Sequence, residues 1–230
     1  HADPGAIDVP DLDRLGFPFA IVEADGSATL SKAPGTGGRV DLATVRAQLF
    51  YEVHDPRAYV TPDVVADFAS ARLASIAPDV VAISGARGRP RPETLKVTVC
   101  AREGHVGEGQ IAYVGPNALA RARLAADIVA KRLATRGLAI DDLRLDLLGV
   151  DALHGAGARA DAEPTEVVLR VVARCRDARS ALLVGQEVQS LLTNGPAAGG
   201  GDVRRVKPLV GVHSGVIARE RVAHRVEVLA

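Results

Sequence analysis

The sequence of 230 residues contains no methionine and no tryptophan, and aromatic residues make up only 3% of it. Methionine is missing even at position 1, where His1 stands. An intact translation product begins with methionine, so we expect this chain to be one piece of a longer or split protein. The expected partner is a missing N-terminal half or a separate partner chain, and the sequence leaves a homo-oligomer open as well.

The sequence also lacks an excess of charge of either sign. Its 28 Lys and Arg residues balance 28 Asp and Glu residues, which gives a formal net charge of zero. A nucleic-acid-binding protein needs clustered positive charge to displace counterions, so we expect no nucleic-acid partner. No apolar run approaches the roughly 18 residues that a membrane-spanning helix needs, so we expect no membrane partner either.

Cysteine is scarce, since only Cys100 and Cys175 occur. The alternation of apolar and polar residues points Cys175 toward a core and Cys100 away from it. We therefore expect no disulfide, and we expect a reducing, cytoplasmic location. The sequence has no CxxC or HExxH spacing and no dinucleotide-binding fingerprint, so it predicts no metal site and identifies no cofactor.

The first part of the chain, residues 1–90, predicts a mixed α/β portion that a missing segment completes. Asp25-Gly26 is a hairpin signal between two strand-like segments. Asp41 is a candidate N-cap for the helix that follows it. The predicted elements are strands at 17–23, 27–32, 64–68, 71–76 and 79–84 and a helix at 42–53.

The second part, residues 91–230, begins after a loop of Gly, Pro and Arg at 85–92, which we interpret as a boundary between subdomains. Apolar and polar residues then alternate in several strand-like segments, and two longer segments carry apolar stripes of helical spacing. Two helices on one face of a mostly antiparallel sheet predict a ferredoxin-like α+β sandwich. The predicted elements are strands at 95–101, 110–114, 143–147, 166–174, 206–212 and 222–229 and helices at 117–136 and 178–192.

A glycine loop precedes the predicted N-terminal helix. The backbone amides of Gly35, Thr36, Gly37 and Gly38, together with the positive end of the helix, can bind a phosphate or carboxylate. Lys32 is near enough in sequence to assist. The alternative is a plain turn between a hairpin and a helix, because the spacing matches no phosphate-binding motif.

Two further loops are candidates for substrate binding. Arg87, Arg89 and Arg91 can clamp an anionic substrate, or they can form a solvated loop. Asn194 and Gly195 begin a glycine-rich stretch that extends to residue 201. Close approach of a ligand or another chain would explain so many glycines, and so would a flexible connector.

The candidate catalytic residues are Glu52, His54 and Asp55, at the predicted end of the first helix. A histidine beside a carboxylate can act as a general acid or base. The alternative is structural, with the histidine near helix carbonyl groups and Asp55 forming the turn before Pro56. The sequence contains no motif that pairs a nucleophile with a base.

Seven short stretches, spread over nearly the whole chain from Leu15 onward, form an uncommon combination: 35–40, 48–56, 61–68, 84–90, 95–97, 193–196 and 216–222. In this combination the chain resembles the AtuA-type acyclic terpene utilisation family, and it is similar to the second half of that family's core region. The resemblance implies a role in bacterial breakdown of acyclic terpenes such as citronellol and geraniol, which proceeds through acyl-CoA thioesters. It implies no particular reaction and no catalytic residue.

Two hypotheses follow. In the first, the chain acts in bacterial catabolism of acyclic terpenes, or of related branched acyl-CoA or carboxylate intermediates, by binding a small anionic acyl substrate. In the second, it is a non-catalytic binding or assembly module of a larger complex. Glycine and arginine loops that converge on one cleft would favour the first hypothesis, and loops dispersed over a flat surface would favour the second.

Overall fold

The computed structural model describes residues 9–158, 163–223, 225 and 227. The chain divides into two compact units. Unit 1 comprises residues 1–97 together with 216–230, and unit 2 comprises residues 98–215. Unit 2 is therefore inserted into unit 1 along the chain. Over the described residues, three α-helices and three sheets confirm the predicted α+β class.

Unit 2 has the ferredoxin-like arrangement that the sequence predicts. Its sheet has the strand order β11-β8-β10-β9, so that β10 lies between two strands that a helix connects. Strand β10 is antiparallel to both of its neighbours. The elements are β8 (Thr94–Val114), α2 (Ala118–Thr135), β9 (Ile140–Leu148), β10 (Glu166–Cys175), α3 (Ala178–Asn194) and β11 (Gly199–Ala218).

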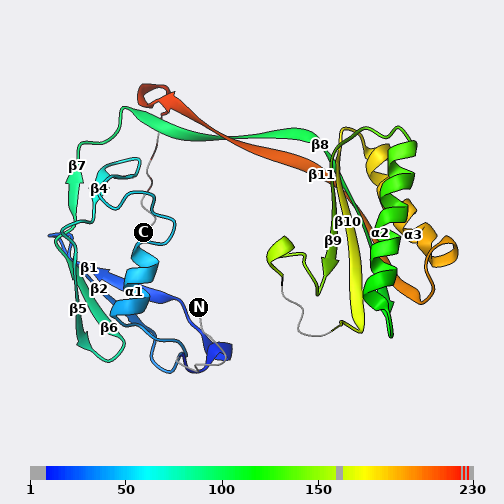
Figure 1. The fold of residues 1–230 in the computed structure, drawn as a ribbon. Helices are drawn as coiled ribbons and strands as arrows, with labels where there is room; N and C mark the ends of the chain where they lie inside the picture. The colour runs from blue at the N-terminus through cyan, green and yellow to red at the C-terminus, as the bar shows by residue number, and fades with distance from the viewer. Residues whose placement is uncertain (1–8, 159–162, 224, 226, 228–230) are drawn as a thin grey trace. The chain divides into compact units, whose positions relative to one another are not determined.

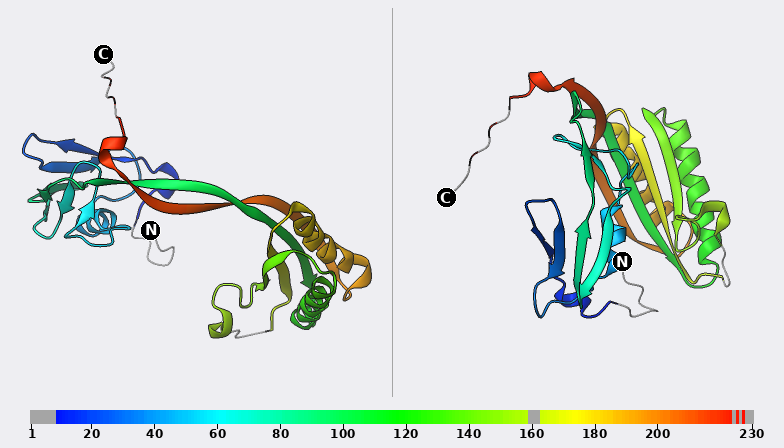
Figure 2. Two further views of the ribbon diagram at one scale, coloured as in Figure 1. Left: turned by 90° about the horizontal axis from the view of Figure 1, so that it is seen from above. Right: turned by 90° about the vertical axis from the view of Figure 1, so that its left-hand side faces the viewer.

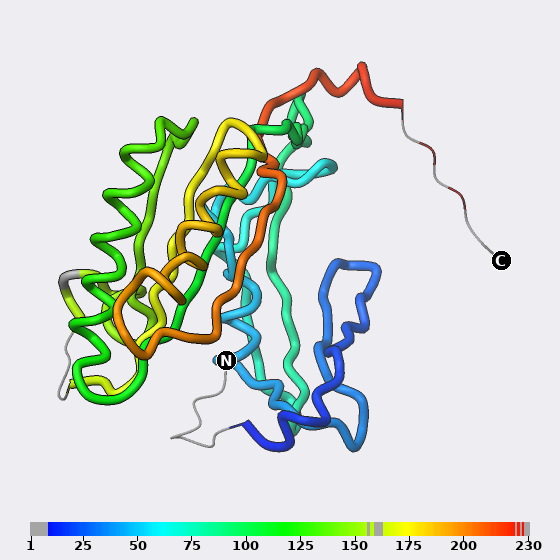
Figure 3. Tube along the Cα trace, turned by 90° about the vertical axis from the view of Figure 1, so that its right-hand side faces the viewer, coloured from blue at the N-terminus to red at the C-terminus, as the bar shows by residue number. Residues whose placement is uncertain are grey.

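Helices α2 and α3 lie beside one another on one face of this sheet, as predicted (Figures 1 and 3). Alternate residues of β10, from Val167 to Cys175, point into the core, and Cys100 is exposed, which confirms the predicted orientation of both cysteines. The helices contribute Val129 from α2 and Val188 from α3, among others. Over the described residues, no helix combines the length and the apolar character that crossing a membrane requires.

The predicted order of elements in this region is wrong at both ends. Strand β8 is one continuous strand rather than two, and β11 begins at Gly199 and ends at Ala218, far beyond the predicted 206–212. The two strands lie side by side (Figure 2). Of the predicted strand 222–229, positions 224, 226, 228 and 229 lie outside the described residues, and the rest is not in a strand.

Close packing explains the glycines that interrupt the strand pattern of β8. A Cβ atom at Gly107 would lie 2.2 Å from the carbonyl oxygen of Ala181 on α3. A Cβ atom at Gly109 would lie 2.7 Å from the side chain of Val188. These two glycines therefore allow α3 to approach the sheet, and they do not end the strand.

Unit 1 contains two small sheets. The first has the strand order β1-β2-β6-β5, and the second has the order β3-β4-β7. Strand β7 lies within the predicted loop 85–92, so the loop prediction is wrong there. The strands are β1 (Pro18–Val22), β2 (Ala28–Lys32), β3 (Tyr59–Val60), β4 (Val65–Asp67), β5 (Arg72–Ala77), β6 (Val80–Ser84) and β7 (Arg87–Arg89).

Helix α1 (Leu42–Leu49) begins where the sequence predicts. The carboxylate of Asp41 accepts a hydrogen bond from the Thr44 amide at 2.9 Å, and the Thr44 hydroxyl accepts one from the Asp41 amide at 3.0 Å. This capping box confirms Asp41 as the N-cap. The helix ends four residues before the predicted Val53, because the chain turns there and Glu52 takes the left-handed backbone conformation with φ of 58°.

Unit 1 has almost no buried core. Among its described residues, Val45 on α1 and Val81 on β6 are the only buried hydrophobic side chains. Many large apolar side chains remain exposed instead, including Phe17, which is 96% exposed. The core of the chain lies in unit 2, and unit 1 depends on hydrogen-bonded loops and short strands.

Candidate functional site

The glycine loop and Lys32 lie together in unit 1. The Nζ atom of Lys32 donates hydrogen bonds to the carbonyl oxygens of Thr36 at 3.0 Å and Gly38 at 2.8 Å. The amides of Thr36, Gly37 and Gly38 donate to the carbonyl oxygens of Ala33, Arg14 and Pro10, respectively. The structure thus brings these predicted site residues together. Three of the loop amides, however, already donate hydrogen bonds to backbone carbonyl groups.

Asp79 joins this cluster from the turn between β5 and β6. Its carboxylate accepts a hydrogen bond from the Val40 amide at 2.9 Å and forms an ion pair with Lys32 at 3.3 Å. The hydrogen bond from Val40 is the main cause that holds the pKa of Asp79 below its ordinary value, and Lys32 adds to it. Sequence reasoning missed Asp79, because no local pattern connects it to the glycine loop.

A cavity of about 520 Å³ opens beside this cluster, and we call it the loop cavity. Its lining contains two cationic side chains, Lys32 and Arg39, and no carboxylate. Arg39 also pairs with Asp41, its Nε atom lying 2.6 Å from the carboxylate. The remaining lining consists of Thr44, glycines of the loop and apolar residues such as Leu15.

A second cavity in unit 1, of about 440 Å³, is mainly apolar, and we call it the apolar cavity. The rings of Tyr59 and Phe68, whose centroids are 6.0 Å apart, line it together with aliphatic side chains. Leu30 on β2 and Val45 on α1 also belong to its lining.

The two cavities share the same two elements as walls. Leu30 lines the apolar cavity and Lys32 lines the loop cavity, and residues two apart on a strand point to the same face of the sheet. On α1, Val45 lines the apolar cavity and its neighbour Thr44 lines the loop cavity. Strand β2 and helix α1 therefore present an apolar and a cationic cavity along one sheet face.

The candidate catalytic residues Glu52, His54 and Asp55 are exposed and adjoin the apolar cavity without lining it. Tyr51 and Val53, which alternate with them along the chain, provide the lining. The Asp55 carboxylate accepts a hydrogen bond from the Arg57 amide at 2.9 Å, which is the turn geometry of the structural alternative. No hydrogen bond or ion pair of the described residues joins the three side chains to one another.

The three loop arginines do not lie together at one site. Arg87 and Arg89 are exposed on β7, where Arg89 pairs with Asp67 at 3.3 Å. Arg91 lies in a different hollow, together with Arg219. None of the hydrogen bonds or ion pairs of the described residues joins Arg87 or Arg89 to the glycine loop, and neither arginine lines the loop cavity.

The remaining predicted residues, Asn194 and Gly195, belong to unit 2 and end helix α3. The Asn194 carbonyl accepts a hydrogen bond from Arg132 on α2 at 3.1 Å. A Cβ atom at Gly195 would lie 2.5 Å from the Leu191 carbonyl oxygen, so close packing requires glycine there. The glycine run continues into β11, where a Cβ atom at Gly199 would lie 3.1 Å from the ring of Tyr113.

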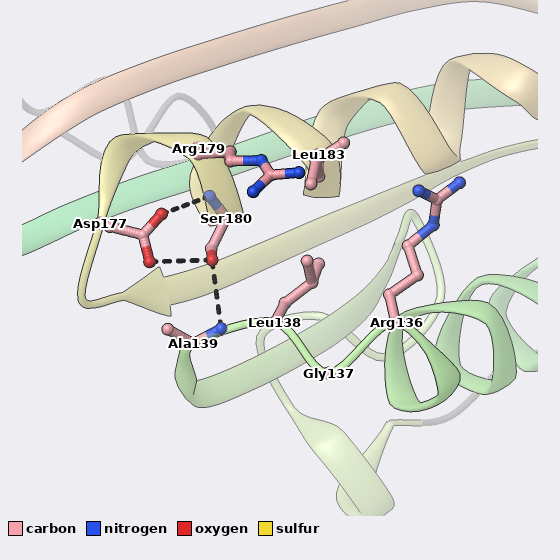
Figure 4. A pocket seen from close by; sticks show the side chains of 8 residues that line it. All are labelled: Arg136, Gly137, Leu138, Ala139, Asp177, Arg179, Ser180 and Leu183. Carbon is pink, nitrogen blue, oxygen red and sulfur yellow. Dashed lines mark hydrogen bonds between the residues drawn. The ribbon is translucent and has the colours of Figure 1, made fainter.

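Unit 2 has a hollow of about 440 Å³ at the start of α3, where Arg136 and Arg179 contribute to the lining (Figure 4). The Asp177 carboxylate accepts hydrogen bonds there from the Ser180 amide at 2.7 Å and the Ser180 hydroxyl at 3.0 Å. These bonds hold the pKa of Asp177 below its ordinary value. A carboxylate thus already occupies this helix terminus, so the hollow is a capping site rather than an anion site.

The face of the unit 2 sheet opposite the helices carries an ion-pair ladder that sequence reasoning missed. Arg170 on β10 lies 2.9 Å from Glu108 on β8 and 3.7 Å from Asp146 on β9. Both carboxylates are buried, and the hydrogen bond from Arg170 is the main cause that lowers the pKa of Glu108. Arg170 and Asp146 alternate with apolar residues along their strands, whereas Glu108 lies between two glycines, so the sequence carries little signal of the ladder.

The described residues contain no group of three or more His, Cys, Asp or Glu side chains arranged to hold a metal ion. The candidate site in unit 1 is thus a binding surface made of two cavities. One cavity contributes side-chain cations, and the other contributes apolar walls.

The model of the acyclic terpene utilisation family protein AtuA matches residues 1–228. The chain matches no curated protein and no solved structure. The family match spans nearly all of the chain and confirms the resemblance that the short sequence stretches carry. The chain belongs to the acyclic terpene utilisation (AtuA) family.

Proposed function

We propose that unit 1 binds a branched acyl ligand with an anionic end, such as a carboxylate or a CoA thioester, in the loop cavity and the apolar cavity. Membership of the AtuA family supports a general role in acyclic terpene utilisation. The predicted loops do not converge on one cleft, since Arg87, Arg89 and Gly195 line neither cavity. The finer proposal therefore rests on a different observation, the common wall of the two cavities, formed by β2 and α1.

The apolar cavity suits the hydrocarbon part of such a ligand. Its volume of about 440 Å³ lies within the range of roughly 300 to 1,000 Å³ that is typical of small-molecule sites. Tyr59, Phe68 and Leu30 offer apolar surface without a charged group. Transfer of an apolar chain from water to this surface contributes roughly 25 cal/mol for each Å² buried.

The loop cavity suits the anionic end. Lys32 and Arg39 bring two positive charges to its lining, and the carboxylates that balance them, Asp79 and Asp41, lie outside the lining. A bound carboxylate or phosphate would share these cations with the aspartates through charge-assisted hydrogen bonds. The proposal assigns binding to unit 1 and assigns no reaction, because none of the candidate acid–base groups lines either cavity.

A pair of ligands tests the role of charge without altering the protein. Calorimetric titration would compare citronellate, a branched carboxylate, with citronellol, the corresponding alcohol. We expect the carboxylate to bind about tenfold more tightly or better, because hydrogen bonds to a charged group contribute roughly 1.5 to 3 kcal/mol. Equal affinity for the two ligands, or no binding of either carboxylate or CoA thioester, would contradict the proposal.

A matched pair of variants tests the apolar cavity. Tyr59→Ala removes a ring from the lining, and we expect it to weaken binding of citronellate by about tenfold. Val60→Ala alters the next residue of β3, which is 64% exposed and does not line the cavity, so its affinity should match that of the unaltered chain. Equal losses in the two variants would place the ligand elsewhere.

A further inference from the structure

Strand β1 is an edge strand whose one device against pairing is Pro18 at its first position. Among the residues that the structure describes, it pairs only with β2, and all five of its residues, Pro18–Val22, are exposed. Phe19 is 46% exposed, Ile21 57% and Val22 68%. The strand has no charged residue, so its free edge presents apolar side chains and unpaired backbone groups, a template for pairing with another strand.

The other sheet edges among the described residues carry the devices that prevent such pairing. Strand β5, the opposite edge of the same sheet, has a bulge between Ser75 and Ala77. Strand β11 carries Lys207 and Pro208 near its middle, and β9 carries adjacent aspartates at 141 and 142. Strands β3 and β7 have only two and three residues. Charges, proline, bulges and short length are the usual protection of edge strands, and β1 has only the proline at its first position, where one donor is lost.

Exposed apolar side chains continue just before β1. Leu15 is 56% exposed and Phe17 is 96% exposed. Burial of such side chains against a second chain is favourable, so the apolar surface available for an interface extends beyond the strand itself.

The direction of the backbone groups in β1 defines how a partner strand can bind. The Glu23 amide donates to the Ser27 carbonyl at 2.8 Å, so the backbone groups of odd-numbered residues point toward β2. The amides of Ala20 and Val22 and the carbonyls of Pro18, Ala20 and Val22 therefore point outward. Pro18 lacks only the donor at the first position of the strand.

We propose that β1 is a dimerisation edge, at which a second copy of this chain adds its own β1 in antiparallel orientation about a two-fold axis through Ala20. Ala20 then lies opposite Ala20 of the second copy, and the two residues exchange both of their outward hydrogen bonds. The Val22 amide of each copy donates to the Pro18 carbonyl of the other. Two such bonds and the two at Ala20 use every donor that points outward from Pro18–Val22.

The side chains of β1 suit this register. Phe19 of one copy lies opposite Ile21 of the other, and this contact occurs twice in the two-fold arrangement. Pairs of an aromatic and a β-branched residue contribute to sheet stability when they lie directly opposite each other. Glu23 lies opposite Phe17 of the second copy, so no charged residue opposes itself. A self-compatible edge of this kind favours a second copy of the chain over an unlike partner.

Sedimentation of the full chain, with two matched variants, tests the edge. We expect a dimer that Ile21→Lys weakens at least about tenfold, because two lysines would then oppose apolar partners. Ile76→Lys is the control, since Ile76 is 59% exposed at the opposite edge of the same sheet. It should leave the dimer intact. A monomeric chain, or equal effects of the two variants with the fold retained by circular dichroism, would overturn the proposal.

A cysteine crosslink tests the register, and its result does not depend on a substitution that weakens the dimer. In a Cys100→Ser background, Ala20→Cys should form an intermolecular disulfide under mild oxidation, because directly opposed strand residues have Cα atoms about 5.5 Å apart. Ala74→Cys on β5, which is exposed in the same sheet, is the control and should stay uncrosslinked. Crosslinking at Ala74 that equals crosslinking at Ala20, or none at Ala20, would exclude this register.

Discussion

Gly107 lies where strand β8 passes beneath the first turns of α3. A Cβ atom at this position would lie 2.2 Å from the Ala181 carbonyl oxygen and 2.7 Å from the Ala181 Cα atom. Both atoms belong to helix backbone, which cannot move away without displacing α3 from the sheet. The hydrogen atom of glycine is therefore a packing requirement of the ferredoxin-like core.

Gly107→Ala should destabilise the chain by about 3 kcal/mol, because overpacking a rigid contact forces a backbone shift. Urea unfolding followed by circular dichroism measures this loss. The matched control is Gly200→Ala on β11, where a Cβ atom would meet nothing within 4 Å and the residue does not have positive φ. That variant should unfold at an unchanged or slightly higher urea concentration. A stable Gly107→Ala protein would show that α3 does not pack this closely.

At the scale of the elements, the ion-pair ladder across β8, β10 and β9 should make the stability of the chain depend on pH. Arg170→Met leaves two buried carboxylates, Glu108 and Asp146, without their shared arginine. We expect a loss of about 2 kcal/mol at neutral pH, which is smaller than for a fully buried pair because the Arg170 side chain is 37% exposed. Urea titrations from pH 7 to pH 3 measure the effect.

The sign of the pH dependence follows from Glu108. Its pKa in the folded chain is held below the ordinary value of 4.5, chiefly by the hydrogen bond from Arg170. The stability that this group contributes is complete above that value and is lost as the pH falls through the folded pKa. The difference between Arg170→Met and the unaltered chain should therefore shrink below about pH 4.5. Arg176→Met, which breaks an ion pair whose arginine is 72% exposed, should have little effect at any pH.

The elements also show which parts of the fold sequence patterns can predict. Helices α2 and α3 and strand β10 were predicted to within about two residues, because regular spacing of apolar residues and caps such as Asp177 act locally. Strand β8 is divided in the prediction, which places strands at 95–101 and 110–114 and leaves Gly107 and Gly109 outside both. Their reason is contact with α3, which lies about 75 residues later in the chain and leaves no local signal.

The candidate site shows the same limit. Lys32 contacts the glycine loop, and the sequence indicates their proximity because only a few residues separate them. Asp79 reaches Lys32 from 47 residues away, through a turn that the sequence did not distinguish from any other. The walls of the two cavities depend on how β2 faces α1, which is a tertiary relation that no short motif encodes.

At the scale of the whole molecule, buried apolar surface is divided unequally between the two units. The connected core of unit 2 has 17 buried hydrophobic residues, whereas the described part of unit 1 has only Val45 and Val81. Burial of apolar side chains is the main favourable contribution to folding, so the two units should differ in stability. Because unit 1 buries so little apolar surface by itself, pairing with a second copy of the chain would increase its stability.

Hydrogen exchange with mass spectrometry should resolve this difference. Amides of β10 and α3 should exchange slowest, by opening that approaches global unfolding of unit 2. Amides of β1 and β3 should exchange much faster, and those of β6, which contains buried Val81, should be intermediate.

Dimerisation at β1 adds a concentration dependence, because pairing protects only the associated state. Protection of Ala20 and Val22 should therefore rise with protein concentration, whereas protection of β10 should not change. Equal protection throughout both units at every concentration would mean that the chain folds as one cooperative body and that β1 stays unpaired.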